Sequence, residues 1–216
     1  MTSNLPIAPR RPHTWVRPTG DVQDPYAWLL QKDDTATLQY LNEENAYSQE
    51  WFSQRKSVTD EIFSTIKSRI QEDDASHPVS HSGWWYTSRT ETGKAYAIHS
   101  RGRTATTATD NVLIDENIES QGHDYFSLGA FEVSNNTQLL AWSRDIDGGE
   151  YYTLRIRNAE TGIDTADEIA NTAFGGIAWS AKDDWLFYVT PDDQMRPWQV
   201  WRHQVGTPVA DDVMVY

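Results

Sequence analysis

The chain has 216 residues, a formal net charge of −14 and no cysteine. Its length suffices for one large domain or two small ones, and the lack of cysteine excludes disulfides and thiolate metal sites. The acidic balance argues against nucleic-acid binding, and no apolar run approaches a membrane span or a signal-peptide core, so we expect a cytoplasmic protein without a membrane partner.

Residues 1–75 are predicted to form a helical segment. The stretch TATLQYLNEENAYSQEWF, residues 35–52, follows two aspartates that can cap a helix and contains neither Gly nor Pro. A second helix is predicted to follow, with Ser57 and Asp60 forming a capping box at its start. Its apolar face consists of Val58, Ile62, Phe63, Ile66 and Ile70. Short amphipathic helices are unstable alone, so both helices need a partner surface.

Residues 76–216 change to a pattern of strands and turns. WWYTSRTETGKAYAIHS, residues 84–100, predicts a hairpin that turns at Thr90 to Lys94. LLAWSRDIDGGEYYTLRIRNAETG, residues 139–162, repeats this design, with turns at 147–149 and 160–162. The Gly148-Gly149 pair lacks the helix and the Lys-Ser or Lys-Thr of a phosphate loop, so a turn explains it.

The strand region contains an internal repeat. At a constant offset of 46 residues the aligned pairs are Ser134 with Ser180, Leu140 with Leu186, Trp142 with Tyr188, Tyr152 with Trp198, Leu154 with Val200, and Arg157 with His203. At an offset of 56 the first hairpin aligns with the second, and Tyr86 meets Trp142. A period of about 40 to 50 residues with about four short strands is typical of a β-propeller blade.

We therefore predict a mainly β fold, with about 2.5 to 3 blades of a propeller after the helical segment. A sandwich of repeated hairpins is the alternative. The final residues, ADDVMVY, fall where the outer strand of a blade, or the crossing to the next blade, should begin. Closed propellers have about four to eight blades, so the sequence is expected to break off inside the repeat array.

Several separate motifs resemble the prolyl oligopeptidase family of serine peptidases, and within it the oligopeptidase B group. They occur in the family's order along the chain. The motifs are DPYAWL at 24–29, YLNEENAY at 40–47, QGHDYFSLGAFEVSNN at 121–136, GGEYYTLRIRNAETG at 148–162 and RPWQVWRHQVGT at 196–207. One departure concerns the start of each blade, where the family often has Ser-Pro-Asp-Gly and this chain has Ser134-Asn-Asn-Thr and Ser180-Ala-Lys-Asp. Asn and Asp can still form such turns.

The resemblance implies an architecture and an activity. In the family, a helical N-terminal stretch packs on a C-terminal α/β-hydrolase domain. A seven-bladed propeller inserted between them covers the active site and limits access to short peptides. Members similar to oligopeptidase B cleave after Arg or Lys, which makes short basic peptides the expected partners of a full-length enzyme. This chain would be the gating portion of such an enzyme.

The sequence assigns no catalytic, cofactor-binding or metal-binding residue to this chain. No Gly-x-Ser-x-Gly elbow occurs, and the family supplies its Ser-Asp-His triad from the hydrolase domain. Pro78 between His77 and His81 argues against a helical metal face. His203 is interpreted as structural, and His13, His99 and His123 have no partner pattern. The acidic pairs at 73–74, 183–184, 192–193 and 211–212 are interpreted as solvated turn residues.

Two further hypotheses remain open. One is a non-catalytic binding or assembly module that associates with itself through open propeller edges, and the other is a gene remnant. On the leading hypothesis, the isolated chain is inactive and needs no cofactor.

Overall fold

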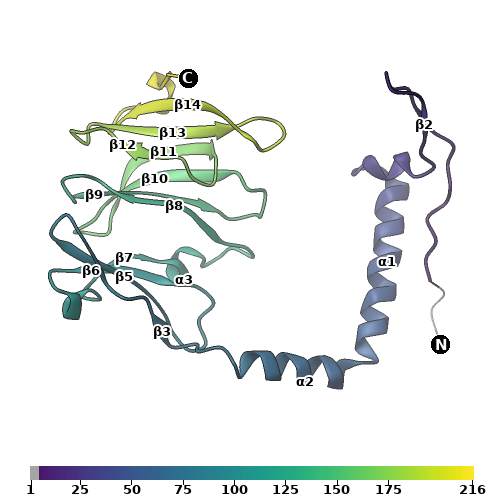
Figure 1. Ribbon diagram of the computed structural model, residues 1–216, viewed down its shortest axis with the longest axis horizontal. Coiled ribbons are helices and arrows are strands. Elements are labelled where there is room, and N and C mark those ends of the chain that lie inside the picture. The colour runs from purple at the N-terminus through teal and green to yellow at the C-terminus, as the bar shows by residue number, and fades with distance from the viewer. Residues whose placement is uncertain (1–4) are drawn as a thin grey trace. The chain divides into compact units, whose positions relative to one another are not determined.

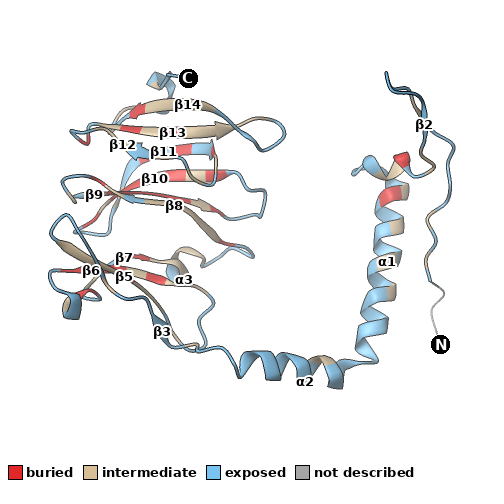
Figure 2. Ribbon diagram, viewed as in Figure 1, coloured by how far each residue is buried: buried red, intermediate tan, exposed pale blue. Residues whose placement is uncertain are grey.

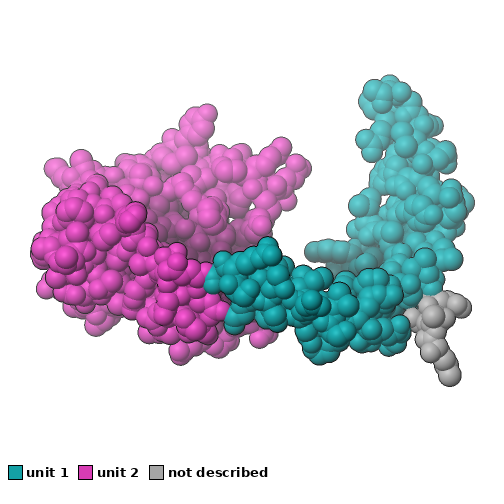
Figure 3. Space-filling view, turned by 60° about the horizontal axis from the view of Figure 1, so that its bottom comes forward, with its two compact units in different colours: residues 1–70 teal, residues 71–216 magenta. Residues whose placement is uncertain are grey.

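The computed structural model describes residues 5–216 and divides into two compact units. The first unit ends at Ile70, and the second runs from Gln71 to Tyr216 (Figures 1 and 3). Each unit has its own arrangement of helices or strands.

The first unit contains the predicted helices. Its elements are β1 (Thr14–Trp15), β2 (Val22–Gln23), the 3-10 helix η1 (Ala27–Leu30), α1 (Thr35–Ser53) and α2 (Lys56–Lys67). The predicted cap of the first helix is confirmed, because the Asp34 carboxylate accepts hydrogen bonds from the backbone amides of Ala36 and Thr37. The strands β1 and β2 form a short antiparallel pair.

The predicted capping box of the second helix is wrong. Helix α2 begins at Lys56, and its N-cap residue, Arg55, forms no side-chain cap. Ser57 therefore lies inside the first turn, and Asp60 instead accepts hydrogen bonds from the Lys56 ammonium one turn earlier. The apolar face of α2 has the predicted spacing, but its residues are exposed, and even Val58 and Ile62, the least exposed, are 54% exposed. Nearly the whole helix is coloured as exposed (Figure 2).

The second unit consists of three antiparallel sheets (Figure 1). The first sheet contains β3 (Asp74–Ala75), β4 (Val79–His81), β5 (Trp84–Thr90), β6 (Ile98–Gly102) and β7 (Asn111–Asp115). The second contains β8 (Ser127–Val133), β9 (Leu139–Asp145), β10 (Tyr152–Asn158) and β11 (Asp164–Thr172). The third contains β12 (Ala178–Trp179), β13 (Trp185–Pro191), β14 (Pro197–Gln204) and β15 (Val213–Met214). Short helices η2 (Ala105–Thr107), α3 (Glu116–Glu119) and η3 (Val209–Asp211) lie in the connections.

The core lies between successive sheets. One cluster contains Leu113 and Ile114 of the first sheet with Leu140 and Trp142 of the second. The next cluster joins the second and third sheets, and its buried members are Ala141, Leu154, Ile156, Ile169, Leu186 and Tyr188. Neighbours along β9 thus enter different clusters, because alternate side chains of a strand point to opposite faces. A sheet buried on both faces is what stacked blades require.

The repeat at an offset of 46 residues is confirmed. Strands β9 and β13 begin at Leu139 and Trp185, and Leu140 and Leu186 each pack toward the preceding sheet. The alignment at an offset of 56 is wrong in register. Tyr86 packs from the first sheet against the cluster that contains Trp142 of the second, so the two residues face each other and are not equivalent. A slip of one residue exchanges the faces of a strand.

The last strand completes the third sheet. Met214 of β15 lies opposite Trp201 of β14, and Val213 lies opposite Arg202. Of the two alternatives for ADDVMVY, the outer strand is therefore confirmed.

Candidate functional site

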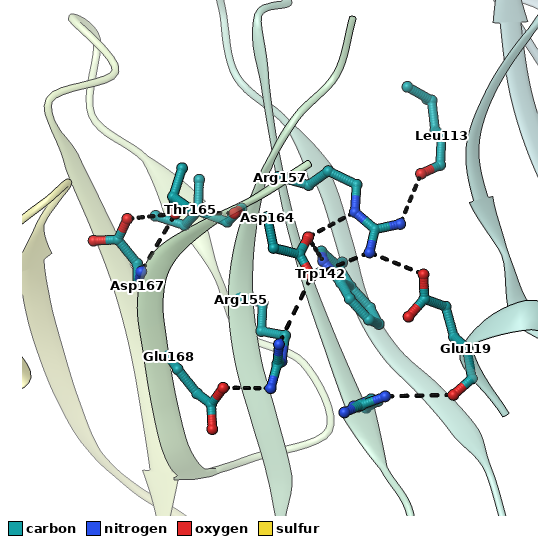
Figure 4. A network of polar contacts seen from close by, with 11 residues as sticks. Leu113, Glu119, Trp142, Arg155, Arg157, Asp164, Thr165, Asp167 and Glu168 are labelled. Atoms are coloured by element: carbon teal, nitrogen blue, oxygen red, sulfur yellow. Dashed lines mark hydrogen bonds and ion pairs between the residues drawn. The ribbon is translucent and has the colours of Figure 1, made fainter. Parts of the chain in front are cut away.

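Arg157 links the second sheet to the first (Figure 4). Its guanidinium contacts Glu119, whose Oε1 lies 2.9 Å from Nη2, and Asp164, whose Oδ1 lies 2.6 Å from Nε. It also lies over the ring of the fully buried Trp142, at 4.7 Å. Burial alone would lower the pKa of Arg157, but the carboxylates of Asp164 and Glu119 outweigh burial and raise it. Its Nη1 also donates to the backbone carbonyl of Leu113 in β7, at 3.4 Å, so this side chain is a charged connector of the two sheets.

His203, the equivalent residue in the next repeat, links the third sheet to the second. Its ring is fully buried, with Nε2 at 2.8 Å from Asp167 of the second sheet and Nδ1 at 2.7 Å from Asp212. The structural interpretation of His203 is confirmed. The interpretation of Asp212 as a solvated turn residue is wrong, because only 2% of its side chain is exposed and it also accepts a hydrogen bond from the Tyr188 hydroxyl.

Asp183 corrects a second of these interpretations. Its carboxylate is buried and accepts hydrogen bonds from the backbone amides of Asn135 and Asn136, both at 2.8 Å, and from the Asn135 side chain at 2.7 Å. The turn of the third sheet is thereby joined to the turn of the second. Thr137 and Asp183, at equivalent repeat positions, have φ angles of 65° and 61°. The turns that depart from the family's pattern thus still form.

A cavity of about 560 Å³ lies where loops of the second and third sheets meet. It is lined by the start of β8, by the β9–β10 loop and the first residue of β10, by the crossing from β11 to β12, and by the β13–β14 loop with the adjoining ends of its strands. Its lining is rich in aromatic side chains, and Glu150 supplies a carboxylate. The cavity could hold an extended chain with an apolar side chain and a cationic group.

Asp145 holds the loop that presents Glu150. Its buried carboxylate accepts hydrogen bonds from the amides of Asp147 and Gly148, both at 3.0 Å, and of Glu150 at 2.9 Å. Burial raises the pKa of Asp145, but these backbone hydrogen bonds outweigh burial and leave the pKa below its ordinary value. Gly148, with φ of 79°, confirms the predicted turn role of the glycine pair.

Aromatic rings form the wall of the cavity. The rings of Tyr152 and Phe174 meet edge to face, with centroids 5.5 Å apart. Tyr152 can pack this deeply because residue 129 is glycine: a Cβ there would lie 2.5 Å from the Tyr152 ring. Burial raises the pKa of the Tyr152 hydroxyl, which keeps it neutral. Phe174 is 64% exposed, so its ring is available to a ligand.

The cavity offers groups that can bind a ligand, but its serine hydroxyl is paired with the Tyr152 hydroxyl and not with a base. Ser127 contributes a hydroxyl, which lies 3.3 Å from the Tyr152 hydroxyl, and no histidine lines the cavity among the described residues. Acyl transfer needs a nucleophile beside a base. The residues of this site were not predicted from the sequence. The sequence signal that could have indicated the site is the large aromatic residue Phe174 directly before the glycine pair 175–176.

His99 has partners that sequence reasoning missed. Its Nδ1 lies 2.8 Å from the Ser88 hydroxyl, and its Nε2 lies 2.7 Å from Glu116. His77 and His81 join no group of three metal-ligating side chains within residues 5–216. Over the same residues, no helix combines the length and apolar character needed to cross a membrane.

Stacked antiparallel sheets of four or five strands, each joined to the next by an apolar cluster and polar connectors, define the class as a β-propeller domain. The sequence matches the family described as "Prolyl oligopeptidase, N-terminal beta-propeller domain" over residues 6–216. The chain belongs to the prolyl oligopeptidase family, as its motifs predicted.

Named relatives agree with this assignment. The chain is 33% identical to "Protease 2" of Moraxella lacunata and 35% identical to "Dipeptidyl aminopeptidase BI" of Pseudoxanthomonas mexicana, in each case over 98% of the chain. It superposes on oligopeptidase B of Leishmania major with a TM-score of 0.87 and 29% identity, over 99% of the chain. The chain spans about a third of the length of these relatives, 32% of each curated protein and 33% of the solved one.

Proposed function

We propose that this chain is the gating and substrate-access portion of an oligopeptidase B-like serine peptidase that hydrolyses short peptides after Arg or Lys. The observation that carries the proposal is the superposition on oligopeptidase B over 99% of the chain. The triad is contributed by an α/β-hydrolase domain, and the propeller excludes folded proteins from it.

The cavity between the second and third sheets gives the propeller a direct part in substrate binding. Glu150 is exposed at its rim, and Tyr152 and Phe174 offer ring faces and edges. A carboxylate beside aromatic rings suits a guanidinium or ammonium group, through an ion pair and cation–π contact. The net charge of −14 also attracts cationic peptides over longer distances.

An exchange experiment tests the assignment. The chain replaces the matching third of Leishmania major oligopeptidase B, and cleavage of peptides with Arg, Lys or a neutral residue before the scissile bond is measured. We expect the chimera to cleave after Arg and Lys, and the isolated chain to cleave none of them. A folded chimera without this preference, or turnover by the isolated chain, contradicts the proposal.

The same chimera tests Glu150. We expect Glu150→Gln to raise KM for a peptide with two consecutive arginines by about tenfold, the order of one charge-assisted contact, and to leave KM for a peptide with a single arginine nearly unchanged. Glu132→Gln, which changes an exposed carboxylate of β8 outside the cavity, is the matched control. Equal changes for both peptides would assign Glu150 no role in recognising the second cation.

A second candidate activity is the release of dipeptides from a free N-terminus. It is favoured by the 35% identity to a protein named as a dipeptidyl aminopeptidase. In this case Glu150 would bind the terminal ammonium group. Peptides with free and acetylated N-termini separate the two activities, because acetylation abolishes dipeptide release and leaves cleavage after internal Arg or Lys intact.

A further inference from the structure

A second cavity, of about 470 Å³, lies between the first and second sheets. Its lining comes from the start of β5, the end of β6, β7, and the loops that follow β8 and β10. It shares no lining residue with the cavity around Glu150. Its chemistry also differs, because hydrogen-bond donors dominate it.

Arg101 is a buried cation without a carboxylate partner in the described part of the chain. Its side chain is 2% exposed, and it donates to the backbone carbonyls of Thr137 at 2.6 Å and Ala159 at 3.1 Å. Its Nε has no hydrogen-bond partner. Arg157 and His203, which also connect sheets, each contact two carboxylates. A buried charge balanced only by dipoles favours an anion nearby.

Arg103 adds a second guanidinium to the same cavity. The guanidinium carbons of Arg101 and Arg103 lie 4.0 and 3.5 Å from the ring of Trp84. Arg101 is in β6, and Arg103 lies two residues later, in the bend that follows the strand, and both guanidinium groups reach Trp84. Gly102 between them is required for this path, because a Cβ there would lie 1.7 Å from the carbonyl oxygen of Thr107.

Two asparagines add further hydrogen-bond donors to the lining of this cavity. The side-chain oxygen of Asn136 accepts hydrogen bonds from Ser134 and Gln138, and that of Asn158 accepts from the amides of Glu160 and Thr161. Their oxygens are thus engaged, and the NH₂ group of each remains as a donor. Both residues line the cavity. Glu160 is the one carboxylate among the described lining residues.

We propose that this cavity binds a small organic anion through a carboxylate or phosphate group, held by Arg101 and Arg103 beside Trp84. Guanidinium groups match both kinds of oxyanion with paired hydrogen bonds, and the volume lies in the range of small-molecule sites. The site is separate from the one proposed for cationic substrate groups. It gives a protein of net charge −14 a local positive site for an anion.

Calorimetric titration tests the proposal. The 216-residue chain is titrated with inorganic phosphate and, separately, with succinate, and chloride keeps the ionic strength constant. We expect saturable binding to one site, weakened at least tenfold by Arg103→Gln, since one of the two guanidiniums is lost. Arg103 is exposed, so this variant keeps the buried contacts of Arg101. Arg69→Gln removes the same charge outside the cavity and should change the affinity less than twofold.

We expect Glu160→Gln to change the affinity for the anion in the opposite direction. Removing this carboxylate from the cavity should tighten binding severalfold, because a like charge then no longer faces the anion. Binding of phosphate but not succinate, or the reverse, identifies the preferred group. The proposal is overturned if neither anion binds saturably up to roughly 10 mM, the weak end of specific affinities, or if Arg69→Gln weakens binding as much as Arg103→Gln.

Discussion

Ionisable side chains buried between the sheets stabilise this protein. His203 lies between two carboxylates, Asp167 and Asp212, each of which has 2% of its side chain exposed. Replacing His203 with Ala leaves two buried carboxylates facing a void. We expect a loss of about 3–5 kcal/mol in the free energy of unfolding, measured by urea denaturation. His123→Ala, at an exposed position, is the control, and similar losses for both would refute a special role for His203.

The same cluster predicts a dependence on pH. Burial raises the pKa of Asp167, but hydrogen bonds from Thr165, His203 and the Gly206 amide outweigh burial and hold the pKa below its ordinary value of 3.8. Its contribution to stability is therefore present above the unfolded-state pKa and is lost as the pH falls through the lower, folded-state value. Urea denaturation below about pH 4 should show a steep loss of stability. In Asp167→Asn this loss should be shallower, and an unchanged slope would contradict the assignment.

At the scale of elements, the turns are joined to one another as well as to their own strands. Asp183 accepts three hydrogen bonds from Asn135 and Asn136 in the preceding sheet. Asp183→Ala should destabilise the chain by about 1–3 kcal/mol, because two backbone amides lose their acceptor. Thermal unfolding with Lys182→Ala as the adjacent control tests this. Equal midpoints for the two variants would mean that the link between turns contributes nothing.

The strands and helices agree with the sequence-based predictions in some places and differ from them in others. The offset of 46 residues placed β9 with β13 and Arg157 with His203, because apolar positions repeat in phase with the strands. The alignment at an offset of 56 failed in register, since a match between two aromatic residues does not indicate which face of a strand points to which sheet. The capping box failed because Ser57 has the right residue type, but α2 begins at Lys56 with Arg55 as its N-cap residue, which places Ser57 inside the first turn.

At the scale of the whole molecule, the chain spans about a third of its relatives and leaves strand edges and apolar side chains uncovered. Trp198 on β14 is 62% exposed. We expect weak self-association, seen in sedimentation velocity as a mass that rises with concentration, and expect Trp198→Lys to reduce it. A monomer at every concentration would show that these edges are protected within the chain.

The sequence by itself determined that the N-terminal part contains helices, that short strands repeat after it, and which family the chain belongs to. Hydrophobic periodicity and local motifs are properties of neighbouring residues, so they can be recognised without the structure. The tertiary structure alone decided which acidic residues are buried. Asp183 and Asp212 have the composition and position of turn residues, yet each meets a partner from a distant part of the chain. Both cavities arise in the same way, since Glu150 and Phe174, or Arg101 and Asn158, come together only when the sheets stack. Contacts between sheets depend on packing across long sequence separations, which no local pattern encodes.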